Sequence, residues 1–397
     1  MKRTIVMAAG WLLAATSNAQ TLGNALEQAW ERHPQAQVFN AREAEAKART
    51  EVATGLTPTP PSMSLSNESD RLNTDVGKDT WELEVAMPMW LPGQRAARGR
   101  EADSAQAEVS ARKVALRLQL AGEVRDAWWA LAGARNALDL ALRRETTAKT
   151  LQADVQRRFK AGELARLDAN LADGERLAAE GEVLEAQSLV RQAEQAYRIL
   201  TGLDAPNLLL EETAPATRTL TPLHPQLAAV QSLAQLAQAR MGVAQQTRRD
   251  APELALRWVR DRGDFNSGYT TSIGIKLTVP FASGARFRQE TSAAQAEVLQ
   301  AEAELALTQQ RLALDAVRAQ RDAEVVQLQM GKAQERLTLT DDSLRLSEKS
   351  FALGESDLAS LLRARAAMFE AQAAFNRQRT ARAASLSRLN QSLGVMP

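Results

Sequence analysis

Side chains able to perform acid–base, nucleophilic or metal chemistry are scarce in this sequence. The 397 residues include two histidines and no cysteine, which removes disulfide scaffolds, thiolate zinc sites and cysteine nucleophiles. An enzyme of this composition would have to use carboxylates alone. The acidic residues stand mostly among Arg and Gln on expected helix faces, where solvated ion pairs are the usual arrangement, and no isolated acid pair lies in an apolar setting. We therefore expect no catalytic, cofactor or metal site.

The composition also narrows the fold and the partners. Lys and Arg number 49 against 48 Asp and Glu, a formal charge of +1, so the basic balance typical of nucleic-acid-binding proteins is missing and we expect no nucleic acid partner. Ala, Leu, Gln, Arg and Glu dominate, while aromatic residues make up 4%. Such a composition is typical of long helices rather than of an ordinary globular core.

The two histidines occupy equivalent positions in an internal repeat. His33 precedes Pro34 and His224 precedes Pro225, each at an expected helix start, where proline suits the first turn. We interpret both histidines as structural residues. A shift of 191 or 192 residues aligns further landmarks in the same order. The aligned pairs include Pro88 with Pro280, Gly93 with Gly284, Phe159 with Phe351, Gly162 with Gly354 and Glu163 with Glu355.

The repeat divides the chain into four segments. Residues 1–19 combine a basic start, an apolar run and a small-residue cleavage site, the order found in a secretory signal peptide. Residues 20–202 form the first repeat and residues 224–397 the second. Between them, residues 203–223 contain three prolines and little periodicity, which indicates an irregular linker.

Each repeat predicts a helix, a pair of strands, a very long helix and a shorter return helix. The first helix covers 22–55. The proline-free segments 94–158 and 285–350 would extend about 97 and 99 Å at about 1.5 Å per residue. The return helices, at 164–200 and 357–393, are about half as long, so two short helices stacked end to end would match one long helix.

Apolar residues along the long helices follow the seven-residue spacing of coiled coils. Alanines beside them would allow another helix to approach closely. We expect the seams to contain Val124, Trp128, Leu131, Leu138 and Leu142 in the first long helix, and Val298, Leu305, Leu312, Ala319, Val326 and Ala333 in the second.

The strands alternate apolar and polar residues, so each has one apolar face. Such a sheet suits either a half-buried soluble position or a membrane, with one face toward lipid and the other toward a watery lumen. Four strands cannot close a barrel, which needs about eight, and unpaired sheet edges are not tolerated in lipid. Three chains would supply about twelve strands. In a barrel, the apolar Leu83, Val85, Ile273, Ile275 and Leu277 would face lipid, and Glu82, Glu84 and Lys276 would face the lumen.

The combined pattern resembles the TolC-type outer membrane efflux proteins. The resemblance rests on the signal peptide, the duplicated order of elements, the strand-ending prolines and the sequences Phe159-Lys-Ala-Gly-Glu163 and Phe351-Ala-Leu-Gly-Glu355, and it covers nearly all of the mature chain. It implies a mainly α fold with a small β part. Long coiled-coil helices would form a trimeric α-barrel in the periplasm, and four strands per chain would contribute to a 12-stranded transmembrane β-barrel.

The same resemblance implies a passive channel of a tripartite efflux pump in the outer membrane of a Gram-negative bacterium. Its partners would be two further copies of the chain, a periplasmic adaptor (membrane fusion) protein, an inner-membrane transporter of the resistance-nodulation-division type, and outer membrane lipid. The compact loops resemble the heavy-metal efflux branch, although no cluster of Cys, His or Met supports a metal cargo. The rival interpretation is a soluble periplasmic coiled-coil scaffold without channel activity.

The resemblance assigns expected roles to three groups of residues. Family channels commonly narrow at acidic residues six and nine positions beyond the second tip glycine, but Ser360 and Arg363 stand there in this chain. A constriction would therefore be absent or built differently, from Asp168, Asp357, Ser360 and Arg363. Strand-to-helix turns are expected at Pro88, Gly93, Pro280 and Gly284. Adaptor docking is expected at the helical tips, at Phe159, Lys160, Gly162, Glu163, Phe351, Gly354, Glu355 and Ser356.

Overall fold

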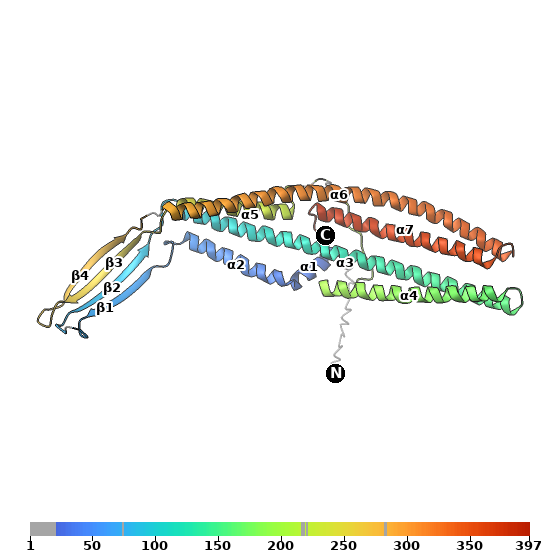
Figure 1. The fold of residues 1–397 in the computed structure, drawn as a ribbon, viewed down its shortest axis with the longest axis horizontal. Helices are drawn as coiled ribbons and strands as arrows, with labels where there is room; N and C mark the ends of the chain where they lie inside the picture. The colour runs from blue at the N-terminus through green and yellow to red at the C-terminus, as the bar shows by residue number, and fades with distance from the viewer. Residues whose placement is uncertain (1–20, 74, 216–218, 220, 282–283) are drawn as a thin grey trace, which may run out of the picture.

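The computed structural model describes residues 21–73, 75–215, 219, 221–281 and 284–397. The expected signal peptide at 1–19 lies outside these residues. The described chain is elongated and mainly helical, with a four-stranded sheet at one end and two helical hairpins at the other (Figure 1). None of the described helices combines the length and the apolar character that crossing a bilayer requires.

One order of elements occurs twice along the chain. The first set comprises α1 (Leu22–Arg32), α2 (Pro34–Thr54), β1 (Ser62–Ser69), β2 (Asp79–Pro88), α3 (Gln94–Lys160) and α4 (Arg166–Thr201). The second set comprises α5 (Pro225–Gln246), β3 (Glu253–Arg262), β4 (Thr270–Thr278), α6 (Gly284–Ala352) and α7 (Leu358–Ser392). The expectation of mainly α structure with a small β part is confirmed.

The single helix expected over 22–55 is two helices, because the chain breaks at His33. This residue is extended, with ψ at 125°, and its Nδ1 accepts a hydrogen bond from the Gln35 N–H at 3.2 Å, which caps α2. In the second repeat, Nδ1 of His224 accepts from the Gln226 N–H at 3.2 Å in the same way. Both histidines therefore act as helix caps.

Short helices stack end to end beside each long helix. α3 packs along α1 and α2 toward the sheet and along α4 toward the far end, while α6 packs along α5 and then α7 (Figure 1). α3 also contacts α5 and α7, which joins the two repeats side by side. Most expected seam residues are buried or half-buried, but Leu142 is 42% exposed, so its assignment to the seam is wrong.

The strands form one antiparallel sheet in the order β1-β2-β3-β4. Residues directly opposite one another share a face. One face carries the row Leu65, Leu83, Trp258 and Ile273, and the other carries the row Ser64, Glu84, Arg257 and Gly274. Within the described residues, β1 and β4 have no second partner strand.

Candidate functional site

Ion pairs cross the polar face of the sheet. Glu82 accepts from Arg257 with 2.6 Å between oxygen and nitrogen, and Glu84 is paired with Lys276 at 3.3 Å. Lys276 reaches Glu84 from β4 across the small side chain of Ala255 on the intervening β3. The structure therefore brings the three expected lumen residues, Glu82, Glu84 and Lys276, together on one face. Whether that face lines a lumen stays a prediction.

The opposite face of the sheet is apolar and uncovered. Ile273 is 73% exposed and Ile275 is 78% exposed, and their neighbours Leu277, Leu256 and Met63 are also exposed. A contiguous apolar surface of this kind marks a site of contact with lipid or with another protein. The sheet thus separates an apolar face from an ion-paired one.

The strand-to-helix connections differ between the repeats. Pro88 ends β2, and Gly93 then adopts a left-handed φ of 76° before α3, where an added Cβ would lie 2.9 Å from the Gln246 side chain. Pro280 follows β4, but Gly284 is the first residue of α6. The turn expected at Gly284 is therefore wrong, because α6 already begins at this residue.

Both helical tips use the same backbone turn. Gly162 and Gly354 have left-handed φ values of 82° and 75°. The Gly162 N–H donates to the Phe159 carbonyl at 3.0 Å and the Glu163 N–H to the Arg158 carbonyl at 2.9 Å, and the second tip repeats both bonds. This hydrogen-bond pair is the Schellman motif, which favours glycine at the left-handed position. The expected turn at each tip glycine is present.

The four candidate constriction residues lie at the starts of the return helices. Asp168 accepts from the Ala165 N–H at 3.2 Å, and Asp357 accepts from the Ser360 N–H at 2.8 Å. Arg363 donates to the Ser360 hydroxyl at 2.9 Å. Hydrogen bonds from the Ser360 side chain and backbone lower the pKa of the Asp357 carboxyl. These contacts cap α4 and α7, and a constriction at these residues stays a prediction.

The two tips pack against each other. Phe351 is 8% exposed and belongs to a buried cluster with Val155, Leu344, Leu358 and Leu361. This cluster includes side chains of both hairpins, α3 with α4 and α6 with α7. It therefore fixes the position of one tip relative to the other.

The adaptor-docking candidates differ in their accessibility. Lys160, Glu163 and Glu355 are exposed, Phe159 is half-buried and Phe351 is buried. The Ser356 hydroxyl is buried and has no hydrogen-bond partner among the described residues. Only part of the expected docking set therefore presents its side chains to a partner in this chain. Docking at the tips stays a prediction.

Residues 222–395 match the family model described as outer membrane efflux protein. The second repeat is therefore similar to the outer membrane efflux proteins. The match covers α5 to α7 and both strands of that repeat, and it confirms the family resemblance predicted from the sequence. Since the first repeat has the same order of elements, the efflux protein architecture extends to the first repeat in fold.

Solved outer membrane proteins share this fold over nearly the whole chain. The Vibrio cholerae outer membrane protein VceC aligns with a TM-score of 0.76 at 19% identity, covering 94% of this chain and 96% of its own. The Campylobacter jejuni outer membrane channel CmeC gives 0.74 at 18% identity, covering 94% and 85%. CusC, described with transmembrane channel formation, gives 0.79 at 15% identity, covering 99% and 96%. No curated protein matches the sequence significantly.

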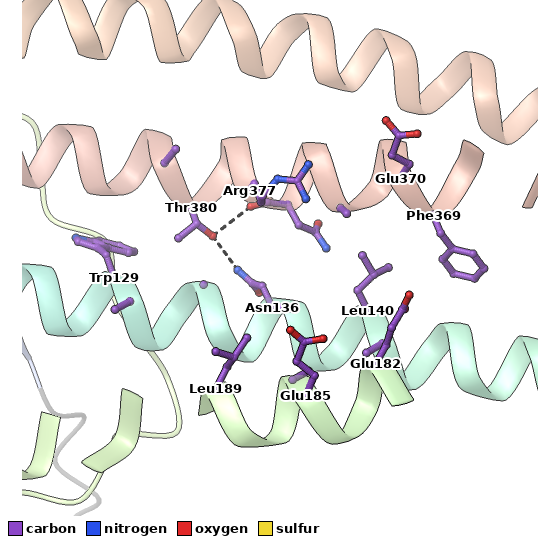
Figure 2. Close-up of a pocket in the computed structure, with 18 of the residues that line it drawn as sticks. Trp129, Asn136, Leu140, Glu182, Glu185, Leu189, Phe369, Glu370, Arg377 and Thr380 are labelled. Atoms are coloured by element: carbon purple, nitrogen blue, oxygen red, sulfur yellow. Dashed lines mark hydrogen bonds between the residues drawn. The ribbon is translucent and has the colours of Figure 1, made fainter. Parts of the chain in front are cut away.

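A groove on the helical part of the efflux protein fold was not predicted from the sequence. It lies between α3, α4 and α7, has a volume of about 770 Å³ and has Trp129, Leu140 and Phe369 among its apolar walls (Figure 2). Asn136 donates to the Thr380 hydroxyl at 2.9 Å across it. Small residues on one side of α3 leave this space. They recur every three or four residues, at Ala130, Gly133, Ala137 and Ala141, and this spacing was the signal in the sequence that could have indicated the groove. The groove is an open trough, unlike enclosed small-molecule sites.

Proposed function

We propose that this protein is the passive outer membrane channel of a tripartite efflux pump and that it works as a homotrimer. The two-faced sheet is the observation that carries the proposal. Its apolar face suits lipid, its ion-paired face suits a watery lumen, and its two open edges suit pairing with further copies of the chain. The family match over residues 222–395 supports the same conclusion.

Closure through three chains follows from strand number. Four strands per chain give about twelve in a trimer, which is enough to leave a lumen. The helices have matching open surfaces. Exposed leucines lie seven residues apart on both flanking helices, at Leu307 and Leu314 on α6 and at Leu177 and Leu184 on α4, and Leu328 lies fourteen residues beyond Leu314. Such rows suit coiled-coil packing between α6 of one copy and α4 of the next.

In this proposal, the two ends of the elongated chain lie in different compartments. The sheet lies in the outer membrane of a Gram-negative bacterium, and α3, with 67 residues, extends about 100 Å into the periplasm. The paired tips then face a periplasmic adaptor protein and, beyond it, an inner-membrane transporter of the resistance-nodulation-division type. Cargo passes through without chemical change, so the channel needs no catalytic residue.

The rival, a soluble periplasmic scaffold, would leave the apolar face of the sheet in water. Exposed Ile273 and Ile275 argue against it. Two measurements decide between the proposals. The channel predicts a trimer mass in detergent after extraction from outer membranes, and discrete conductance in planar lipid bilayers. A stable monomer in the soluble periplasmic fraction, with no conductance, would support the scaffold instead.

A further inference from the structure

The apolar face of the sheet changes character at its loop end. Its aliphatic rows end at Trp258 and Trp81, and the next side chains of β3 on the same face are Arg260 and Arg262. Arg260 lies opposite Trp81, and Arg262 lies opposite Asp79. Two cations therefore stand at the outer end of the face that suits lipid.

Aromatic rings hold these two cations in place. The guanidinium carbon of Arg260 lies 4.4 Å from the centroid of the Tyr269 ring, and that of Arg262 lies 4.9 Å from the same centroid. Arg262 also lies over Phe265 at 5.5 Å and donates from Nε to the Gly77 carbonyl at 3.0 Å. Trp81, Trp258, Arg260 and Tyr269 line a recess of about 280 Å³. We call Trp81, Trp258, Arg260, Arg262 and Tyr269 the outer-rim cluster.

The two arginines of the outer-rim cluster lie near carboxylates of the described residues, but they form no close ion pair with one. On the polar face, Arg257 and Lys276 each form an ion pair with a glutamate. Neither Arg260 nor Arg262 forms an ion pair with a carboxylate of the described residues. Asp79, opposite Arg262 on this face, accepts from the Tyr269 hydroxyl at 2.8 Å and from Asn67 at 2.7 Å, and Arg262 attracts Asp79 and Asp264 only at longer range.

The position of the cluster along the strands matches the depth of lipid headgroups. Arg262 lies nine positions beyond Glu253, the residue at the helical end of β3. That separation is about 31 Å of strand at about 3.4 Å per residue, which is about 22–25 Å of height at a strand tilt of about 35–45°. The lipid-facing band of outer membrane barrels is about 25 Å tall. An arginine at its midplane costs about 2–4 kcal/mol, but about 0–1 kcal/mol near the interface. Trp and Tyr also favour that interface.

We propose that the outer-rim cluster binds a phosphate group of a phosphorylated glycolipid of the outer leaflet, a lipopolysaccharide-type lipid. Guanidinium groups bind phosphate through paired charged hydrogen bonds. The tryptophan and tyrosine rings offer flat, amphipathic surfaces to the sugars and the first acyl carbons. The inference rests on the proposed function, because only a chain in the outer membrane meets this lipid. All residues of the site come from β2, β3 and the loop to β4 of one chain, so a trimer would carry three sites.

Native mass spectrometry of the delipidated trimer in detergent tests this proposal. We expect bisphosphorylated lipid A to bind in up to three copies per trimer. The double variant R260Q/R262Q should weaken that binding about tenfold or more, and dephosphorylated lipid A should bind the wild type and the variant equally weakly. R257Q is the matched control, because Arg257 is on the same strand but on the polar face, and it should bind lipid A like the wild type.

Trimer mass and bilayer conductance are recorded for every variant. If the trimer forms and conducts but R260Q/R262Q binds lipid A as well as the wild type, the site is refuted while the channel function stands. Equal binding of phosphatidylglycerol would also refute it, because the site would then select any anionic lipid. Failure of the wild-type chain to form a conducting trimer would refute the proposed function itself.

Discussion

The guanidinium carbon of Arg158, in the first tip, lies 5.2 Å from the ring centroid of Phe351, in the second tip. This contact joins the two hairpins of one chain at the end farthest from the sheet. In the repeat alignment, Ser350 of the second tip is equivalent to Arg158, and Phe159 of the first tip is equivalent to Phe351. Because Ser350 has no cation, the second repeat cannot offer the same contact to Phe159 of a neighbouring copy. This cation–π contact therefore links the two tips of one chain.

Arg158→Gln should loosen the paired tips. The cation–π contact is worth about 0.5–1 kcal/mol, and Arg158 also pairs with Glu163 inside the first tip at 3.3 Å. The amide hydrogens at 352–357, in the other tip, therefore report the lost contact and should exchange about two- to fivefold faster. Arg157→Gln is the matched control, because Arg157 is exposed and pairs only with Asp154 on its own helix. Equal exchange in both variants, measured by mass spectrometry, would show that the contact does not couple the tips.

The sequence predicted the element order and the two faces of the sheet, because both follow from local periodicity. The alternation of apolar and polar residues around Leu83 and Ile273 is visible in the sequence of each strand by itself. Leu142 was misassigned because the side of α3 that packs on α4 follows Leu138, Ala141 and Ala148, which leaves Leu142 beside the seam and exposed. The contact between Arg158 and Phe351 joins residues far apart in the sequence, and no local pattern indicates it.

Substitution of the tip glycines should separate assembly from efflux. Gly162→Val and Gly354→Val place a branched side chain at φ of 82° and 75°, which costs about 1–2 kcal/mol or more. No atom lies within 4 Å of an added Cβ at either position, so the cost comes from the backbone and not from a clash. The sheet is about 100 Å away along α3. We expect loss of efflux in a drug-accumulation assay, with trimers still present in the outer membrane.

Gly174→Ala provides the control for this experiment. Gly174 lies inside α4 and also has open space around an added Cβ, so alanine should stabilise the helix by up to about 1 kcal/mol. Cysteines at the exposed Lys160 and Glu355 should then crosslink to the adaptor. Crosslinks only at exposed mid-helix positions such as Asp139 would place the docking site away from the tips.

Adjacent residues on opposite sheet faces should tolerate arginine differently. Ile273→Arg introduces a charge on the apolar face, at an expected cost of about 2–4 kcal/mol in lipid. Ser272→Arg introduces the same charge at the same depth on the polar face, where the cost should be far lower. The yield of trimer in outer membranes measures the difference. If both variants assemble equally well, the assignment of the two faces is incorrect.

The buried pair of Arg125 and Glu212 should hold the linker against α3. Their side chains are 2% and 9% exposed, with 2.7 Å between Nη2 and the carboxylate. Glu212→Gln leaves the arginine charge buried without its partner and should cost about 3–5 kcal/mol. The neighbouring Glu211 pairs with Arg382 at the surface, so Glu211→Gln should cost about 0–1 kcal/mol. On mild heating, proteolysis of the linker should be faster in Glu212→Gln than in the wild type, and it should be unchanged in Glu211→Gln.

Acid should weaken the cap at the start of α5. His224 is 1% exposed, and burial lowers the pKa of its imidazole. The folded chain therefore keeps the ring neutral, with Nδ1 free to accept from the Gln226 N–H. As the pH falls below about 6.5, the unfolded chain takes up a proton that the folded chain excludes, so stability declines.

His224→Asn isolates this effect, because asparagine also caps helices but does not titrate in this range. Between pH 7.5 and 5.5, the wild-type trimer should lose thermal stability relative to His224→Asn. The limit is about 1.4 kcal/mol per chain when the pH is one unit below the unfolded pKa. The midpoint of heat-induced trimer loss in detergent, recorded at several pH values, measures the difference. Parallel pH profiles for the two proteins would mean that His224 takes up its proton equally well in the folded chain, contrary to the effect of its burial.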